Sequence, residues 1–145
     1  MVGNTDGHRC GFASPQMDTD GAEFVPAVNA LTEKIIGCAF AVSRTLGHGF
    51  LEAVYKNALA VELEMAGLGF CKEKTFPVYY REERVGNYVA DIVVADLIIV
   101  ELKTVEAIST IHFAQTLNYL KASNLPAGLL LNFGKPRLEV KRVRL

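Results

Sequence analysis

Apolar residues recur at helical spacing in the first half of the chain. Between residues 31 and 46 they fall at steps of three and four, which predicts a helix that Asn29 can cap and Gly47 ends. A second apolar face runs over residues 51–66 and predicts another helix. Gly47 and Gly49 therefore predict a tight corner between two helices.

Strand patterns occupy the middle of the chain, in the four segments 70–75, 78–81, 85–94 and 96–103. Pro77 interrupts the first two segments, which predicts one weak, broken strand followed by a polar turn at residues 82–84. The last two segments predict a hairpin whose turn lies near Ala95 and Asp96.

One helix and two strands are predicted for the rest of the chain. Helical spacing returns over residues 109–122, and Pro126 then breaks the chain. Residues 127–131 are apolar and uncharged, as in a buried central strand, whereas residues 138–143 roughly alternate, as in a half-exposed strand. The order α-α-β-β-β-α-β-β predicts an α/β fold of the α+β type without internal repeats.

Composition indicates one soluble globular domain. Of the 145 residues, 50% are apolar and 21% are charged. Residues 1–26 lack apolar periodicity and predict a flexible tail, which leaves residues 27–145 as the domain. No unbroken apolar run approaches the roughly 20 residues of a membrane helix, and no signal-peptide pattern is present. Three scattered cysteines argue against a disulfide framework, so we expect a cytoplasmic protein without a membrane partner.

Charge is distributed unevenly along the chain. The net charge of −1 excludes an obvious nucleic-acid binder of the strongly basic kind. After Glu106, however, the chain has six lysines and arginines but only one glutamate, so this segment carries a charge of +5 and the rest of the chain −6. Two interpretations stay open for this basic segment: an edge strand protected by charge, or a surface that contacts phosphate.

Charged residues end the most apolar strand of the predicted hairpin. Glu101 and Lys103 are two apart on this strand and share a face, and Val89, Asp91 and Val93 are predicted to share a face of the preceding strand. The turn can bring Asp91 close to Glu101 or to its neighbour across the ladder. Two adjacent carboxylates repel unless a cation separates them, and Mg²⁺ prefers oxygen ligands, to which the carbonyl of Leu102 can be added. A bound water can then lose a proton and attack phosphorus, while Lys103 stabilises the phosphate charge or orients that water.

Each of these residues also has a purely structural interpretation. The strand charges can be a surface pair, because an isolated E-x-K is common by chance. Glu52 and Tyr55 share a face of the second helix, where an acid favours the helix dipole and a tyrosine joins the core. Gln115 and Tyr119 share a face of the later helix, where a solvated glutamine beside a packed tyrosine is ordinary.

Several blocks together resemble one family. The run Gly49-x-x-Glu52-x-x-Tyr55 resembles the motif that names the GxxExxY proteins, small bacterial and archaeal members of the PD-(D/E)xK nuclease superfamily. Further blocks that resemble this family lie at residues 31–37, 88–91, 100–103, 114–121 and 128–134. The resemblance covers about residues 30–145 and implies a restriction-endonuclease-like core, with a central mixed sheet flanked by helices.

The resemblance also implies roles for single residues. Asp91 and Glu101 would be ligands of Mg²⁺ (or Mn²⁺), Lys103 the catalytic lysine and Glu52 a helix-borne acid that supports the metal. The remaining pair, Gln115 and Tyr119, would form the Q-x-x-x-Y element that some branches carry beside the active site. There are two departures: Ala90 stands where the superfamily's name has proline, a position that varies, and His48 stands where the family commonly has proline. Neither removes a ligand.

The leading hypothesis is therefore a metal-dependent nuclease that acts on DNA or RNA. The alternative is a non-catalytic protein on the same fold that binds nucleic acid or protein and regulates it. A homodimer that pairs through the edge strand at residues 138–143 is a further expectation.

Overall fold

The structure, a computed structural model, describes the backbone of residues 21–145 and the side chains from Val25 onward. Its elements are α1 (Gly21–Leu46), α2 (Glu52–Met65), β1 (Phe70–Tyr80), β2 (Glu83–Val94), β3 (Ile98–Lys103), α3 (Thr110–Ser123), β4 (Ala127–Asn132) and β5 (Glu139–Arg144). The predicted order is confirmed. Most of the tail predicted for residues 1–26 lies outside the described residues, and its last part, residues 21–26, belongs to α1.

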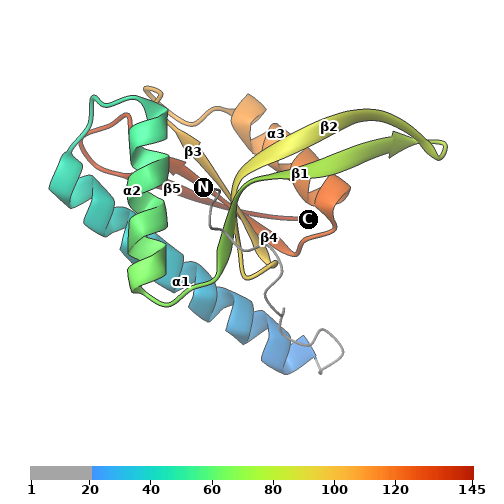
Figure 1. The fold of residues 1–145 in the computed structure, drawn as a ribbon, viewed down its shortest axis with the longest axis horizontal. Coiled ribbons are helices and arrows are strands. Elements are labelled where there is room, and N and C mark those ends of the chain that lie inside the picture. Colours follow the sequence, from blue (N-terminus) through green and yellow to red (C-terminus); the bar gives the residue numbers. More distant parts are fainter. Residues whose placement is uncertain (1–20) are drawn as a thin grey trace, which may run out of the picture.

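The five strands form one mixed sheet in the order β1-β2-β3-β4-β5. Only β3 and β4 are parallel, and the other neighbours are antiparallel. Helices α1 and α2 cover one face of the sheet and α3 covers the other (Figure 1). The expected mixed sheet flanked by helices is thus confirmed, and every residue of β4 is buried, as its apolar sequence predicted.

Alternate residues of β3 face the two helical layers. Ile98, Val100 and Leu102 pack into the core beneath α1 and α2, whereas Ile99 packs with Leu120 of α3. By the same alternation Glu101 and Lys103 point to the α3 side, so their predicted common face follows from a regular strand.

Two boundaries differ from the prediction. Helix α1 begins at Gly21, earlier than predicted, and runs through Pro26. The apolar periodicity did not indicate this first part of the helix because Val25 is exposed. Strand β1 is continuous through Pro77 because β1 is an edge strand, where a missing N–H removes no ladder bond. The turn after β1 lies at Arg81 and Glu82, whose φ values are positive.

Two findings change what was expected from composition. By length and mean hydropathy (1.4), Val25–Leu46 is apolar enough to cross a membrane, although the count of unbroken apolar runs missed it. A core helix passes the same test, and α1 does supply core residues.

The cysteines also differ from the expectation. Cys38 is free and buried, but Cys71 is disulfide-bonded. The odd number of cysteines did not exclude this, since it excludes only that all three cysteines pair. The cytoplasmic location loses that support and stays a prediction.

Tyr55 fixes the corner between α1 and α2. Its hydroxyl donates to the Gly47 carbonyl (2.7 Å) and accepts from the Phe50 N–H (3.2 Å), while its ring stacks on Phe133 at 4.7 Å. Gly47 and Gly49 have φ values of 69° and 116°, which favour glycine. The glycine–tyrosine part of the G-x-x-E-x-x-Y motif therefore positions the start of α2, where Glu52 stands.

We expect Tyr55→Phe to lower the free energy of unfolding by about 1–2 kcal/mol, because it leaves two backbone groups at the corner without their partner. Urea denaturation measures this change. Tyr79→Phe is the matched control because Tyr79 is 61% exposed. Equal stability of the two variants would contradict this role of Tyr55.

Candidate active site

The site lies where β2 and β3 part. Strand β2 pairs with β1 along almost its whole length, but with β3 only over three residues, Ile92 to Val94. The β1–β2 hairpin therefore leaves the sheet as a projecting arm (Figure 1). Continuing the β2–β3 register by one residue places Asp91 opposite Glu101, at the point of divergence.

Each of the two carboxylates is hydrogen-bonded to the opposite strand. Glu101 Oε2 accepts hydrogen bonds from the Tyr88 hydroxyl and from the Asp91 N–H (3.2 Å). Asp91 Oδ2 accepts one from the Leu102 N–H (2.9 Å). These bonds replace the ladder that ends at Ile92, so both side chains are fixed in place by backbone groups that need a partner.

One expectation about the hairpin is wrong. Val89, Asp91 and Val93 were predicted to share a face, but Ala90 packs in the same cluster as Val93, so the alternation breaks between these two residues. The break coincides with Glu73 of β1, which is left out of the β1–β2 ladder and has a φ of 56°. A strict two-residue period cannot predict such a break.

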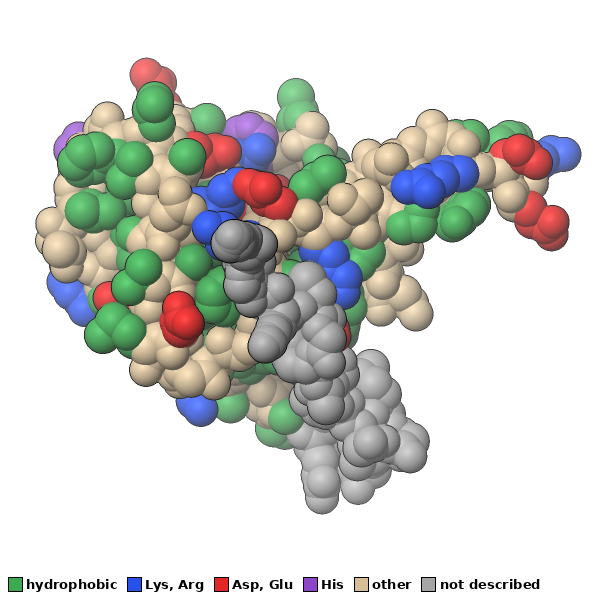
Figure 2. Space-filling model, viewed as in Figure 1, with side chains coloured by type: hydrophobic (Ala, Val, Ile, Leu, Met, Phe, Trp, Pro, Cys, Tyr) green, Lys and Arg blue, Asp and Glu red, His purple; other side chains and the backbone are tan. Residues whose placement is uncertain are grey.

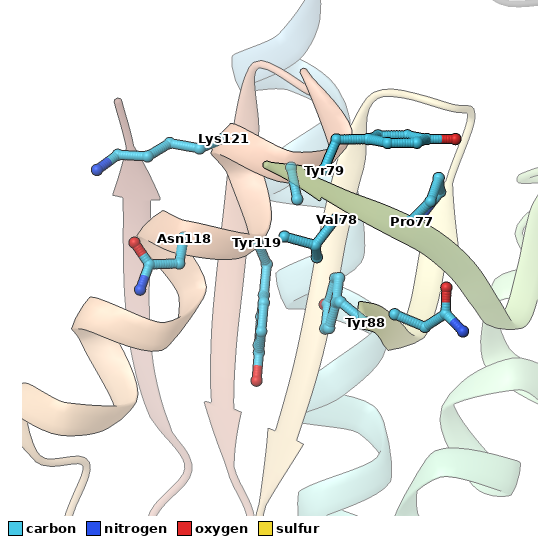
Figure 3. A pocket seen from close by; sticks show the side chains of 9 residues that line it. Pro77, Val78, Tyr79, Tyr88, Asn118, Tyr119 and Lys121 are labelled. Carbon is cyan, nitrogen blue, oxygen red and sulfur yellow. The ribbon is translucent and has the colours of Figure 1, made fainter. Parts of the chain in front are cut away.

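Tyr88 is a site residue that the sequence interpretation missed. The break in alternation turns its side chain to the α3 side, where the hydroxyl meets Glu101. Its ring stacks on Tyr119 with centroids 3.5 Å apart and on Phe76 at 5.9 Å. Figure 3 shows the rings of Tyr88 and Tyr119 side by side, one from β2 and one from α3. Regular alternation would have placed Tyr88 on the face opposite Asp91, so no signal in the pattern identified it.

Burial controls the electrostatics of Glu101, whose exposed fraction is 7%. Desolvation, followed by the charge of Asp91, raises the pKa of Glu101 to about 7 against the lowering effects of its hydrogen bonds and of Lys103. Desolvation and the Glu101 charge also raise the pKa of Tyr88, which keeps its hydroxyl protonated as a donor. A carboxylate poised near neutrality is typical of functional sites.

Helix α2 contributes Glu52 and an unpredicted lysine, Lys56. Lys56 Nζ lies 2.9 Å from Glu73 Oε2 and 3.8 Å from Asp91 Oδ1. Desolvation acts to lower the pKa of Lys56, but the hydrogen bond to Glu73 and the charges of Asp91, Glu73 and Glu52 together raise it. Figure 2 shows acidic and basic side chains gathered between α2 and the base of the hairpin. The four-residue spacing of Glu52 and Lys56 was the available sequence signal.

The other predicted residues are placed unequally. Desolvation and the charge of Asp91 raise the pKa of Glu52, and the charge of Lys103 acts against both. Glu52 and Lys103 are therefore electrostatically coupled to each other and to the site. Tyr119 also belongs there, since desolvation and the charges of Glu101 and Asp91 raise its pKa. Gln115 is exposed on α3, and within residues 25–145 no hydrogen bond joins it to the acidic residues.

The donor set suits a hard divalent cation. Within the described part of the chain, no three His, Cys, Asp or Glu side chains form a metal cluster, so Glu52 does not complete a ready-made triad. Asp91 Oδ1 and Glu101 Oε1, however, accept no hydrogen bond from the described residues, because each carboxylate uses its other oxygen for the hydrogen bonds to the opposite strand. Mg²⁺ keeps several waters and needs only one or two carboxylates, so these residues fit it.

Comparison with known proteins adds one finding. A family model described as the PD-(D/E)XK nuclease superfamily matches residues 29–143, and proteins of that superfamily generally use divalent metals. No curated protein and no solved structure matches the chain.

Proposed function

The chain belongs to the PD-(D/E)XK nuclease superfamily, and on this premise we propose that it is a metal-dependent nuclease that hydrolyses phosphodiester bonds of DNA or RNA. The observation that carries the proposal is the pair of carboxylates, Asp91 and Glu101, each hydrogen-bonded to the backbone of the opposite strand where β2 and β3 diverge. Within the superfamily we place the chain in the GxxExxY group, for which Gly49, Glu52 and Tyr55 of the α1–α2 corner are the support.

Four groups would hold the cation, which we propose to be Mg²⁺ or Mn²⁺. Asp91 Oδ1, Glu101 Oε1 and the carbonyl of Leu102 are the direct candidates, and Glu52 supports them from α2. When bound, the cation would acidify water and neutralise charge on the phosphate.

The remaining residues orient these groups and meet the substrate. Tyr88 donates to Glu101 and fixes which carboxylate oxygen stays open, while Tyr119 holds the Tyr88 ring. Lys103 is partly exposed at the end of β3, on the face of Glu101. Its ammonium stabilises the developing charge on the phosphate or orients the attacking water.

The test is cleavage of labelled single- and double-stranded DNA and RNA with Mg²⁺, Mn²⁺ or EDTA. We expect cleavage of at least one substrate that requires the metal and is lost in Asp91→Asn. Nucleic-acid or protein binding without cleavage, unaffected by metal and by Asp91→Asn, would overturn the proposal in favour of a non-catalytic binding protein.

A groove beside the carboxylates offers a route for the substrate. It has a volume of ≈ 670 Å³ and lies between the arm and α3 (Figure 3), lined by Pro77, Val78, Tyr79, Asn87, Tyr88, Asn118, Tyr119, Lys121 and Ala122. The lining holds aromatic and amide side chains and one lysine but no acid, and Tyr88 connects it to Glu101. Aromatic rings with positive charge suit a single nucleic-acid strand, which we propose as its occupant.

We expect Lys121→Ala to weaken binding of a single-stranded oligonucleotide about three- to tenfold, and to lower the slope of log affinity against log salt by about 0.7, because one phosphate contact is lost. Fluorescence anisotropy in the Asp91→Asn background measures binding without cleavage. Lys34→Ala, exposed on α1, is the control. Equal affinities for the two variants would remove the groove from the substrate path.

A further inference from the structure

Lys56 lies on the open oxygen of Asp91. Its ammonium is 3.8 Å from Asp91 Oδ1, the carboxylate oxygen that the backbone hydrogen bonds leave free. The side chain of Lys56 is only 18% exposed, because it crosses from α2 to the base of the hairpin. A positive charge therefore already faces the oxygen to which a divalent cation would bind.

Glu73 gives the same ammonium a second partner. Its Oε2 is 2.9 Å from Lys56 Nζ, and the hydrogen bond lowers the pKa of Glu73. The backbone of Glu73 is in the left-handed region (φ 56°), which is strained for a non-glycine residue. This strained position interrupts the β1–β2 ladder opposite Asp91 and places two carboxylates of the hairpin on one lysine.

We propose that Lys56 is a resident cation of the site: it neutralises Asp91 while the divalent cation is absent, and Glu73 retains it when that cation binds. The inference rests on the proposed function, since it takes Asp91 as a ligand. Because Lys56 repels an incoming cation, metal affinity stays low until further negative charge arrives. A substrate phosphate supplies such charge, so the cation and the nucleic acid are expected to bind together.

The test is the affinity of the full-length protein for Mn²⁺, measured by isothermal titration calorimetry or by electron paramagnetic resonance without nucleic acid. Lys56→Met keeps the aliphatic stem and removes the charge, and it should bind Mn²⁺ about tenfold more tightly. The matched control is Lys72→Met, which removes the same charge from a lysine that contacts Asn57, on the same α2–β1 contact. We expect its affinity to change less than about twofold, since the charge is more distant and screened.

Glu73→Gln separates the proposal from simple charge counting. It removes a negative charge and releases Lys56 to Asp91, so Mn²⁺ affinity should fall several-fold. In the double variant with Lys56→Met, most of this decrease should disappear, because the released lysine is absent. Persistence of the full decrease in the double variant would show that Glu73 acts on the metal directly and would overturn its role as the second partner.

Two outcomes distinguish this inference from the proposed function. Absence of Mn²⁺ binding by both the wild type and Lys56→Met, with and without a single-stranded oligonucleotide, would overturn both. Mn²⁺ binding that Asp91→Asn abolishes but Lys56→Met leaves unchanged or weakens would overturn the inference alone. Should Lys56→Met fail to fold, Lys56→Gln, which also removes the charge, takes its place in the single and the double variant.

Discussion

Lys103→Ala is expected to reduce phosphodiester hydrolysis by about 10²–10³-fold while the protein stays folded and still binds Mn²⁺. The side chain is partly exposed at the end of β3, so its removal leaves no buried cavity. It lies on the face of Glu101, and its charge acts on both Glu101 and Glu52. Its loss should therefore remove stabilisation of the transition state and not the metal ligands.

The measurement is the initial rate of cleavage of the best substrate from the DNA and RNA panel, at saturating Mn²⁺. Lys34→Ala on α1 serves as the control for loss of a lysine far from the site. Lys103→Arg tests whether a positive charge alone suffices. Full activity of Lys103→Ala would contradict a catalytic role for this residue, and lost Mn²⁺ binding would assign it a structural role.

Glu101→Gln is expected to stabilise the metal-free protein at pH 8, by an amount on the order of 3 kcal/mol. The folded state raises the pKa of Glu101 from 4.5 to about 7, so the folded protein binds the proton more tightly than the unfolded chain. Stability of the wild type is therefore full below about pH 4.5 and decreases as the pH rises through 7. Glutamine resembles the protonated acid and should escape this loss.

Urea denaturation with EDTA, at pH 8 and at pH 4.5, measures the effect. The stabilisation by Glu101→Gln should be present at pH 8 and nearly absent at pH 4.5, whereas hydrolysis, assayed separately with Mn²⁺, should be lost at both. Glu139→Gln is a suitable comparison, since hydrogen bonds from Asn132 and Ile108 lower the pKa of Glu139 and its pH dependence has the opposite sign. An equal gain at both pH values would contradict a buried, proton-binding Glu101.

The order of elements and the core of the sheet were predictable because each strand of the core has a clear pattern. β4 is an uncharged apolar run and is buried along its whole length. The turn at Ala95 and Asp96 is confirmed, with positive φ at both residues, although neither is glycine. Boundaries failed where tertiary position overrode local preference, as at Pro77, which an edge strand tolerates.

Parts of the site depend on the arm and were not predictable. Asp91 and Glu101 followed from spacing, because a short hairpin turn fixes which residues lie opposite. Tyr88 depends on the break at Glu73, where a left-handed residue and an unpaired partner reverse the faces of the strand. A break of this kind depends on how β1 and β2 pair, and the alternation of residues along β2 does not encode it.

The central claim is that Asp91 and Glu101 hold a divalent cation beside Lys103. Anomalous diffraction from crystals soaked in Mn²⁺ tests it most directly. The account predicts a peak in contact with Asp91 Oδ1 and Glu101, with the Lys56 ammonium on Glu73 alone. No peak at saturating Mn²⁺, with Lys56 still facing Asp91, would contradict it.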